Sequence, residues 1–415
     1  MIEKIQIKNY RSCHETTLEL QPDLSVLIGP NGSGKTTILK ACLLILELLN
    51  DRRSRHLGYR EYEKEPATDE CQLKIWFRQD TRRVILNADI QLYTQEDNSD
   101  VILSSDQSWY AKDYTGNRRR IKMPLGFVID LSSSRGEYII HPRYPSTFRF
   151  GKHKLEIPEE FKEPLSLICS YISQIKYYSA SQFTNPASCP VSIEVEKTGF
   201  SNRSSRALRA KRGHTGFIYD LYRAHKTPKL RGYEEFLGVI GQNGIGLVDG
   251  IDFKEIQTSS VEHRVRSGGQ VKTLEREKLL VVPQFILGKN ILSPSQLSEG
   301  TFKTITLLFY VMTEKSSLLL IEEPEVCVHH GLLSSIVELI KTYSKKKQIV
   351  VSTHSDFILD QIKPENVYSV ARNPKDGTKV KGITQSMSSQ DLAALKEYLN
   401  TEGSLGEYWR HGGLE

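Results

Sequence analysis

The sequence lacks the features of a membrane-embedded or secreted protein. No apolar stretch is long enough to span a bilayer, and the N-terminus begins directly in a strand pattern rather than in a signal peptide. Only six of the 415 residues are cysteine, and no two of them form a C-x-x-C pair. This usage argues against a disulfide framework and against a zinc site. We therefore expect reduced thiols, a cytoplasmic location and no membrane partner.

Two further absences limit the architecture. The sequence has no sustained heptads and no internal repeats, so a long coiled-coil arm is not expected. The net charge of +6 is too small to indicate nucleic-acid binding by itself. The chain is longer than a single hydrophobic core usually grows, so we expect two or three subdomains.

A phosphate-binding loop is the most informative motif that is present. Residues 29–37 match G-x-x-x-x-G-K-[ST] and lie between an apolar run at 24–28 and a helical pattern at 36–49. A glycine-rich turn could match by chance, but the strand and helix on either side favour nucleotide binding. Lys35 would bring a charge to the β- and γ-phosphates, and the Thr36 hydroxyl would complete a Mg²⁺ shell. The predicted nucleotide-binding residues of this loop are Asn31, Gly32, Ser33, Gly34, Lys35, Thr36 and Thr37.

An acidic pair ends the apolar strand predicted at 317–321, as in a Walker B element. Glu322 is expected to hold Mg²⁺, and Glu323 is placed to orient and deprotonate an attacking water. The alternative is a strand that enters solvent through an acidic turn. After one intervening helix, predicted at 331–345, a strand at 348–352 ends in Thr-His-Ser. Because of this position, we predict that His354 senses the γ-phosphate.

A short motif, Leu-Ser-Glu-Gly-Thr at 297–301, precedes a helix predicted at about 299–313. A hydroxyl and a glycine amide at a helix N-terminus form an anion site, so Ser298 and Gly300 are predicted to bind nucleotide across a dimer. Ser298 lies 24 residues before Glu322. The segment Ser-Gly-Gly-Gln at 267–270 looks more like the common transporter signature, but it lies 55 residues before Glu322. We interpret 267–270 as a turn.

The remaining pattern indicates two kinds of sheet. Short alternating strands at 73–77, 84–90, 125–129 and 138–140 predict an antiparallel sheet. Helical periodicity near 159–176 precedes a strand at 175–179, and another helix is predicted at 233–241, before a glycine-rich connector at 241–250. From 291 onward, strands and helices alternate as they do in a parallel sheet.

The four motifs together resemble the ATP-binding-cassette-type (ABC-type) ATPase heads of the RecF, structural-maintenance-of-chromosomes and OLD group. The opening segment at 5–12 also looks like this group's first strand and the arginine-bearing turn after it. The resemblance covers about residues 1–50 and 290–372. It implies an α/β fold, namely a P-loop NTPase of the ABC-type ATPase head, with an antiparallel β subdomain and an enlarged α/β insertion.

The resemblance also implies ATP and Mg²⁺ as cofactors and a nucleotide contact from Arg11. Gln182, just after the strand at 175–179, is the candidate for the glutamine that this group uses as a Mg²⁺ or water ligand. ATP binding would drive head-to-tail dimerisation of two copies. The sequence departs from the family's pattern at Glu322, where many members have Asp, and at Glu299, where the signature has Gly.

A nuclease partner is implied in the same way. OLD and Gabija nucleases carry a fused TOPRIM domain after the histidine, whereas 61 residues follow His354. The segments at 404–409 and 412–414 look like the C-terminus of stand-alone ATPases, which are frequent in antiphage systems such as Septu, PARIS and retron operons. The implied function is a switch ATPase that controls a separately encoded HNH or TOPRIM nuclease in bacterial antiphage defence.

Three other functions remain as alternatives. One is a RecF-like DNA-repair ATPase that clamps DNA. A second is the ATPase subunit of a membrane transporter, against which the long basic insertion and the Ser-Glu-Gly-Thr motif count. A third is a scaffold that does not hydrolyse ATP.

Basic residues are concentrated in two segments. Arg203, Arg206, Arg209 and Arg212 recur every third residue and would form one cationic stripe on a helix, suited to DNA or to an acidic partner. A second cluster lies at 118–122. The alternative for both is a solvated charged loop, and neither has the interleaved aromatic residues that stack on single strands.

The predicted domain boundaries follow these patterns. They are 1–50 for ATPase lobe I, 51–150 for the antiparallel β subdomain, 151–290 for a helical and basic insertion, 291–372 for ATPase lobe II and 373–415 for a C-terminal tail.

Overall fold

The structure is a computed structural model of the chain. It describes residues 1–49, 69–79, 82–94, 100–112, 118–121, 127–130, 139–142, 167–168, 170–196, 213–227, 231–265, 271–313, 316–326, 328, 330–401 and 403–411. The chain forms two compact units. The first consists of residues 1–177, 315–323 and 340–415, and the second of residues 178–314 and 324–339.

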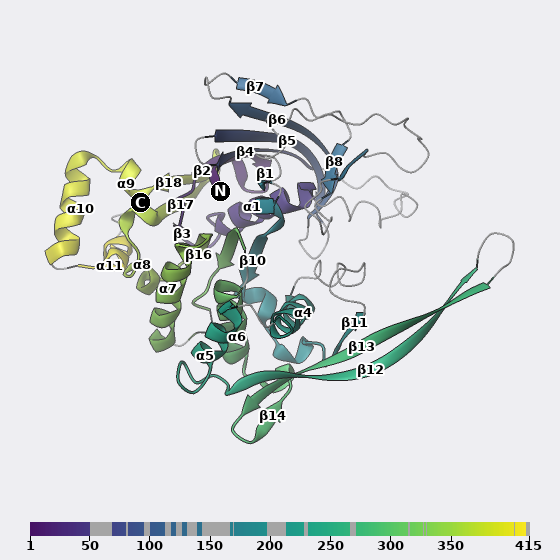
Figure 1. The fold of residues 1–415 in the computed structure, drawn as a ribbon. Helices are drawn as coiled ribbons and strands as arrows, with labels where there is room; N and C mark the ends of the chain where they lie inside the picture. The colour runs from purple at the N-terminus through teal and green to yellow at the C-terminus, as the bar shows by residue number, and fades with distance from the viewer. Residues whose placement is uncertain are drawn as a thin grey trace. The chain divides into compact units, whose positions relative to one another are not determined.

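An antiparallel sheet of order β2-β1-β4-β5-β6-β7 makes up much of the first unit (Figure 1). Its strands are β1 (Ile2–Tyr10), β2 (Cys13–Glu19), β4 (Asp69–Gln79), β5 (Arg82–Thr94), β6 (Asp100–Lys112) and β7 (Arg118–Ile121). Leu73, Ile75 and Phe77 alternate along β4 and are buried, which is why a period of two predicts this strand. The strands predicted at 73–77 and 84–90 are confirmed, whereas β6 was not predicted. A separate pair, β8 (Phe127–Asp130) and β9 (Ile139–Pro142), is also antiparallel, as expected.

A second sheet, of order β10-β15-β16-β3-β17-β18, carries the phosphate loop. Its strands are β10 (Ile175–Ser179), β15 (Leu318–Glu322), β16 (Gln348–Thr353), β3 (Leu24–Ile28), β17 (Val367–Asn373) and β18 (Gly377–Gly382). The four strands β15, β16, β3 and β17 run parallel. Every residue of β3, β15 and β16 is buried, as expected for parallel strands that are covered on both faces. The predicted strands and the helices α1 (Lys35–Leu49) and α7 (His330–Ser344) are confirmed.

The C-terminal segment of the first unit is folded. Antiparallel β17 and β18 are followed by α9 (Ile383–Ser386), α10 (Ser389–Thr401) and α11 (Leu405–Arg410). Helix α11 is fastened to α8 (Asp356–Leu359), because Arg410 forms an ion pair with Asp356 and the Gly406 N–H donates to Oδ1 of Asp360 at 2.7 Å. The described part of the segment predicted as a C-terminal tail, 373–415, therefore forms secondary structure that packs on α8.

The second unit combines helices with a small sheet. Its helices are α4 (Gly213–His225), α5 (Arg231–Ile240) and α6 (Glu299–Met312), and its strands are β11 (Ile193–Glu196), β12 (Gly250–Val265), β13 (Val271–Leu287) and β14 (Asn290–Leu292). Aromatic rings fill its core: the Phe217 ring centroid lies 5.5 Å from that of Phe302 and 5.6 Å from that of Phe309. The predictions of α5 and α6 are confirmed. Helix α4 was missed, because every residue from Gly216 to Tyr222 is buried and no polar face marks its period.

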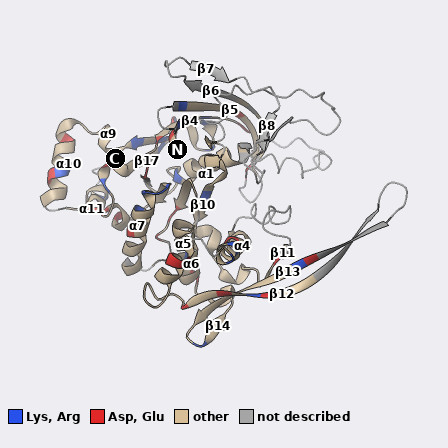
Figure 2. Ribbon diagram, viewed as in Figure 1, with Lys and Arg blue, Asp and Glu red and all other residues tan. Residues whose placement is uncertain are grey.

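A long hairpin, β12–β13, is a further element that was not predicted, apart from a strand within residues 271–285. Its register runs from Gly250 opposite Ile286 to Val265 opposite Val271. Among its residues with described side chains, 250–258 and 277–287, Phe253 and Phe285 are buried at the base, whereas residues 254–258 are exposed. Figure 2 shows both acidic and basic residues along it. A strand that is exposed on both faces gives no alternation of apolar and polar residues to recognise.

Several predicted features lie outside the described residues. They are Arg203, Arg206, Arg209 and Arg212, the turn at 267–270, Lys122 and the segment 412–414. In the part of the chain that is described, no helix is long and apolar enough to cross a membrane.

Candidate functional site

The phosphate loop connects the carboxyl end of β3 to the first residue of α1. Gly29, Gly32 and Gly34 adopt φ values of 153°, 79° and 106°. Residues other than glycine rarely adopt such positive φ values. A Cβ atom at Gly34 would lie 2.2 Å from Oγ1 of Thr378, and one at Gly29 would lie 2.2 Å from the carbonyl oxygen of Val370. Close packing and backbone conformation therefore both require glycine at positions 29 and 34.

The Lys35 side chain lies inside this loop. Its Nζ donates to the carbonyl oxygens of Gly29 at 2.7 Å and Pro30 at 3.1 Å, and the residue is 6% exposed. The Ser33 hydroxyl is buried and has no hydrogen-bond partner among the described residues. A buried ammonium, an unpaired hydroxyl and the N–H groups at the start of α1 are donors that phosphate oxygens can satisfy. The loop therefore fits the phosphates of a nucleotide.

Glu322, the last residue of β15, is held by two hydroxyl groups. Thr36 donates to its Oε1, and Tyr177 of β10 donates to its Oε2. Thr36 and Glu322 thus present two hard oxygen atoms side by side, the ligand type that Mg²⁺ prefers. No cluster of three His, Cys, Asp or Glu side chains that could hold a metal occurs within the described ranges. Mg²⁺ in nucleotide sites usually takes one or two protein oxygens together with phosphates, so this pair fits it.

Glu323 follows immediately and has an unusual backbone conformation. Its φ is +48°, and its N–H donates to the carbonyl oxygen of Ser352 at 2.9 Å. Strands β15 and β16 pair with Glu322 opposite Ser352, so the residues after both strands emerge at one edge of the sheet. The His354 Nδ1 atom accordingly lies 3.9 Å from Oε1 of Glu323. The structure thus brings together the two residues that were predicted to be catalytic.

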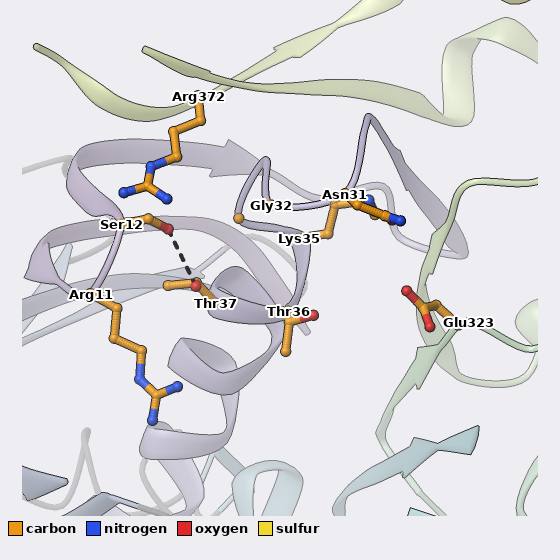
Figure 3. Close-up of a pocket in the computed structure, with 10 residues that line it drawn as sticks. Arg11, Ser12, Asn31, Gly32, Lys35, Thr36, Thr37, Glu323 and Arg372 are labelled. Atoms are coloured by element: carbon orange, nitrogen blue, oxygen red, sulfur yellow. Dashed lines mark hydrogen bonds between the residues drawn. The ribbon is translucent and has the colours of Figure 1, made fainter. Parts of the chain in front are cut away.

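The loop, Glu323 and two arginines line one cavity of 380 Å³ (Figure 3). Its lining residues are Arg11, Ser12, Asn31, Gly32, Gly34, Lys35, Thr36, Thr37, Glu323 and Arg372. In Figure 3, Glu323 lies at one end, Arg11 and Arg372 lie at the other, and Thr36 and Thr37 lie between them. All the predicted loop residues except Ser33 line this cavity.

Arg11 is placed at the cavity by the turn after β1. Its φ is 51°, and its Nη2 lies 2.9 Å from Oδ1 of Asp100, whose other oxygen accepts from the Tyr10 hydroxyl at 2.5 Å. Burial, together with the neighbouring Asp100 carboxylate, raises the pKa of Tyr10, so this hydroxyl stays protonated and donates. The Asp100 carboxylate therefore partly neutralises the positive charge of Arg11. The role of Arg11 as a nucleotide contact stays a prediction.

Three residues of the site, Ser12, Arg372 and Tyr177, were not anticipated as site residues from the sequence. Arg372, near the end of β17, lines the cavity, and Tyr177, within β10, binds Glu322. Neither Arg372 nor Tyr177 belongs to a short motif. The position of each residue at the site depends on the order of strands in the sheet, and local sequence periodicity does not reveal that order.

The remaining predicted residues belong to the second unit. Ser298 is the N-cap of α6: its exposed hydroxyl accepts from the Thr301 N–H at 3.1 Å, and Gly300 is in the first turn of the same helix. Gln182 is half-buried in a short 3-10 turn over Ala180–Phe183. Their proposed partners in the phosphate loop belong to the first unit. The roles of Ser298, Gly300 and Gln182 therefore stay predictions.

Comparison with known families gives two matches. Residues 1–201 match the model described as "AAA ATPase domain", and residues 236–360 match "AAA domain, putative AbiEii toxin, Type IV TA system". The two matched segments include the phosphate loop, the acidic pair and His354.

Similar proteins come from DNA metabolism and from a nuclease family. The DNA double-strand break repair Rad50 ATPase of Methanopyrus kandleri is 41% identical over 69 residues, which is 17% of this chain and 8% of that protein. An OLD nuclease of Thermus scotoductus is 48% identical over 46 residues, 11% of this chain and 8% of that protein. The replication and repair protein RecF of Chlorobium luteolum is 38% identical over 63 residues, 14% of this chain and 17% of that protein.

Each alignment therefore spans only a small part of the relative. Among solved structures, an SmcHead bound to the C-winged helix domain of ScpA aligns with a TM-score of 0.46 and 13% identity, over 95% of this chain and 99% of that one. The two family matches and the named relatives support an ATPase of the ABC type, and the described α/β fold with its phosphate loop agrees with it.

Proposed function

We propose that this chain is an ATP-hydrolysing switch, which dimerises head to tail when it binds ATP and separates after hydrolysis. The observation that carries the proposal is the arrangement of charges around one cavity. Lys35 lies inside the loop, Thr36 bonds Glu322, and Glu323 lies beside His354. These are the groups that phosphoryl transfer to water requires.

Each residue has a separate task in this proposal. Lys35 and the loop N–H groups bind the β- and γ-phosphates, and Glu323 accepts the proton of the attacking water. His354 contacts the γ-phosphate and reports its loss. Thr36 and Glu322 would hold Mg²⁺, which supplies charge neutralisation at the transferred phosphoryl group. In the same proposal, Gln182 contributes a further ligand.

The second half of the site comes from another copy of the chain. The exposed N-terminus of α6, with the Ser298 hydroxyl and the Gly300 amide, has the donors and the dipole that bind an anion. We assign to it the γ-phosphate of the nucleotide in the opposite subunit. One subunit then cannot complete a site by itself, and dimerisation depends on ATP.

The switch controls a separate nuclease in bacterial antiphage defence. The resemblance to stand-alone defence ATPases motivates this part, and two comparisons support it. One matched model is described as a putative AbiEii toxin, and one relative is an OLD nuclease. A partner of HNH or TOPRIM type would supply the cleavage, and the basic stripe at 203–212 would contact nucleic acid or the partner. The domain boundaries given above and a cytoplasmic location belong to the same proposal.

A RecF-like DNA clamp is the second candidate, because the names of the relatives RecF and Rad50 place them in DNA repair. The two candidates differ in their response to DNA. A repair clamp should show strong stimulation of its ATPase activity by DNA in the isolated protein, whereas a defence switch should require its nuclease partner for biological activity.

Native mass measurement tests the switch. Wild-type protein with ATP and Mg²⁺ should shift toward a dimer, and Lys35→Ala should stay monomeric because the loop loses its charge. Glu323→Gln should bind ATP, stay dimeric and lose turnover by about 10²- to 10⁴-fold, the usual contribution of a general base. A strictly monomeric wild type and Glu323→Gln under ATP would exclude the shared site. Unchanged turnover in Glu323→Gln would exclude the assigned base.

A further inference from the structure

The β17–β18 hairpin is packed directly against the phosphate loop. Thr378 of β18 donates its N–H to the Ser12 carbonyl at 2.7 Å and its hydroxyl to the Ser33 carbonyl at 3.0 Å. The contact is too close for side chains at several points. A Cβ atom at Gly34 would collide with Thr378, and one at Gly377, which has a φ of 70°, would lie 2.5 Å from the Ser12 carbonyl oxygen. The hairpin is therefore a fixed wall of the cavity.

Arg372 is the cation that this wall presents to the cavity. It lies opposite Thr378 in the β17–β18 pairing. Because Thr378 is hydrogen-bonded to the phosphate loop, it also positions the backbone of Arg372. Arg372 lines the cavity and is exposed. Its guanidinium has no ion pair or hydrogen bond to any described residue, whereas Arg11 is paired with Asp100. An unpaired guanidinium beside a phosphate cradle is a ready anion contact.

The position of Arg372 along the cavity indicates which part of a nucleotide it meets. Lys35 and Glu323 mark the β- and γ-phosphate end. Arg372 lies at the opposite end in Figure 3, beside Ser12 and Thr37, which themselves share a hydrogen bond of 3.3 Å. A nucleotide that follows the loop from Lys35 to Thr37 would bring its α-phosphate and ribose to this end.

We propose that Arg372 binds the α-phosphate and ribose end of nucleoside 5′-diphosphates and 5′-triphosphates. The inference rests on the proposed function, since it assigns a further contact in the same site. Because this contact does not involve the γ-phosphate, it stabilises ADP and ATP alike and retains the nucleotide after hydrolysis. Arg372 is a binding residue and takes no part in proton transfer.

Calorimetric titration with ADP and with ATP tests the assignment. Arg372→Ala should raise the dissociation constants of ADP and ATP by the same factor, about tenfold, as expected for losing one hydrogen bond between charged groups. Arg372→Lys should recover part of the loss, since it keeps the charge but not the planar fork. Lys375→Ala removes a cation from the turn of the same hairpin, outside the cavity lining, and should change neither affinity.

Two results would overturn the inference. Unchanged ADP affinity in Arg372→Ala would show that Arg372 does not contact the α-phosphate and ribose end. A loss of affinity confined to ATP would show that Arg372 contacts the γ-phosphate instead. The proposed function has its own control, Lys35→Ala. If wild type, checked as folded by thermal unfolding, binds neither nucleotide, then the proposed function and this inference fail together. If Lys35→Ala loses binding while Arg372→Ala does not, only the inference fails.

Discussion

The hydroxyl of Tyr177 donates a hydrogen bond to Oε2 of Glu322, while Thr36 binds the other oxygen of the same carboxylate. Tyr177 comes from β10 and Glu322 from β15, which are neighbours in the sheet. Glu322 is 7% exposed, so both of its oxygens are satisfied by protein hydroxyls rather than by bulk water. The carboxylate is therefore positioned from two sides, and Tyr177 is a positioning residue for it.

Tyr177→Phe should weaken the site without removing any of its proposed ligands. Without the second hydroxyl, Glu322 keeps its charge but is less well oriented, so we expect the Mg²⁺ concentration for half-maximal ATP binding to rise about three- to tenfold, which corresponds to about 1 kcal/mol. Fluorescence titration of a labelled nucleotide against Mg²⁺ measures this directly.

Tyr171→Phe is the matched control for Tyr177→Phe. The Tyr171 hydroxyl donates to Oε1 of Gln348 at 2.6 Å, so this variant also loses the hydrogen bond of a half-buried tyrosine, but one that does not involve Glu322. It should lower thermal stability without changing the Mg²⁺ dependence. An equal shift in both variants would show that general destabilisation, and not the orientation of Glu322, is responsible.

Gly34→Ala and Gly32→Ala should differ sharply although both change one loop glycine. The φ of Gly34 is +106° and an added Cβ would lie 2.2 Å from Thr378, whereas the φ of Gly32 is +79° with nothing within 4 Å. We expect Gly34→Ala to abolish ATP binding and to lower the free energy of unfolding by more than about 2 kcal/mol. Gly32→Ala should cost about 1 kcal/mol of backbone strain and retain binding. Similar unfolding midpoints for the two variants in urea would contradict the packing of the hairpin on the loop.

The edge of the parallel sheet that carries the candidate site was predictable from the sequence because its signals are local. β3, β15 and β16 are short apolar runs; β3 leads into the phosphate loop, β15 ends in Glu322 and β16 ends in Ser352 and Thr353. Parallel strands bring their carboxyl ends to one edge. That rule is sufficient to bring Lys35, Glu323 and His354 together. The predicted residues and the described cavity agree to this extent.

The residues that support this edge could not be found in the same way. Arg372 reaches the loop only because β17 pairs with β3, and Tyr177 reaches Glu322 only because β10 lies beside β15. Pairing between strands far apart in the chain depends on the whole sheet. Helix α4 and the β12–β13 hairpin were missed for a different reason. Helix α4 is buried on nearly all sides, and residues 254–258 of β12 are exposed on both faces, so neither segment shows a periodic contrast.

The buried cysteines should be unreactive in the native protein. Burial raises the pKa of Cys42, Cys71 and Cys189 to about 12 each. Since only the thiolate reacts and the ordinary thiol pKa is about 8.5, its fraction at pH 8 falls by roughly three orders of magnitude. Peptide-resolved mass spectrometry after iodoacetamide treatment at pH 8 should show these three sites alkylated in guanidinium but not in native buffer. Rapid native labelling of Cys42, which lies in α1, would contradict the packing of that helix.

Mixing two inactive variants should restore ATP hydrolysis if the active site is shared between subunits. Lys35→Ala removes the charge of the loop, and Ser298→Arg blocks the N-terminus of α6 with a long side chain at an exposed position. Because Ser298 is also the N-cap of α6, this variant should lose about 1 kcal/mol of stability, which thermal unfolding checks. Each variant alone has two defective sites in a dimer. A mixed dimer has one site in which both defects meet and one site that is intact. An equal mixture should therefore recover part of the wild-type rate, because a mixed dimer has one working site whereas neither variant forms a working site with itself.

A second mixture, Lys35→Ala with Glu323→Gln, is the control for this restoration. Lys35 and Glu323 line the same cavity of one chain, so a mixed dimer of these variants has no intact site and should stay inactive. Measuring phosphate release in both mixtures, at a protein concentration where the wild type is dimeric, separates the two arrangements. Recovery in both mixtures would indicate exchange of whole lobes between chains. Recovery in neither would indicate that Ser298 acts within its own subunit or takes no part, and the head-to-tail dimer would have to be abandoned.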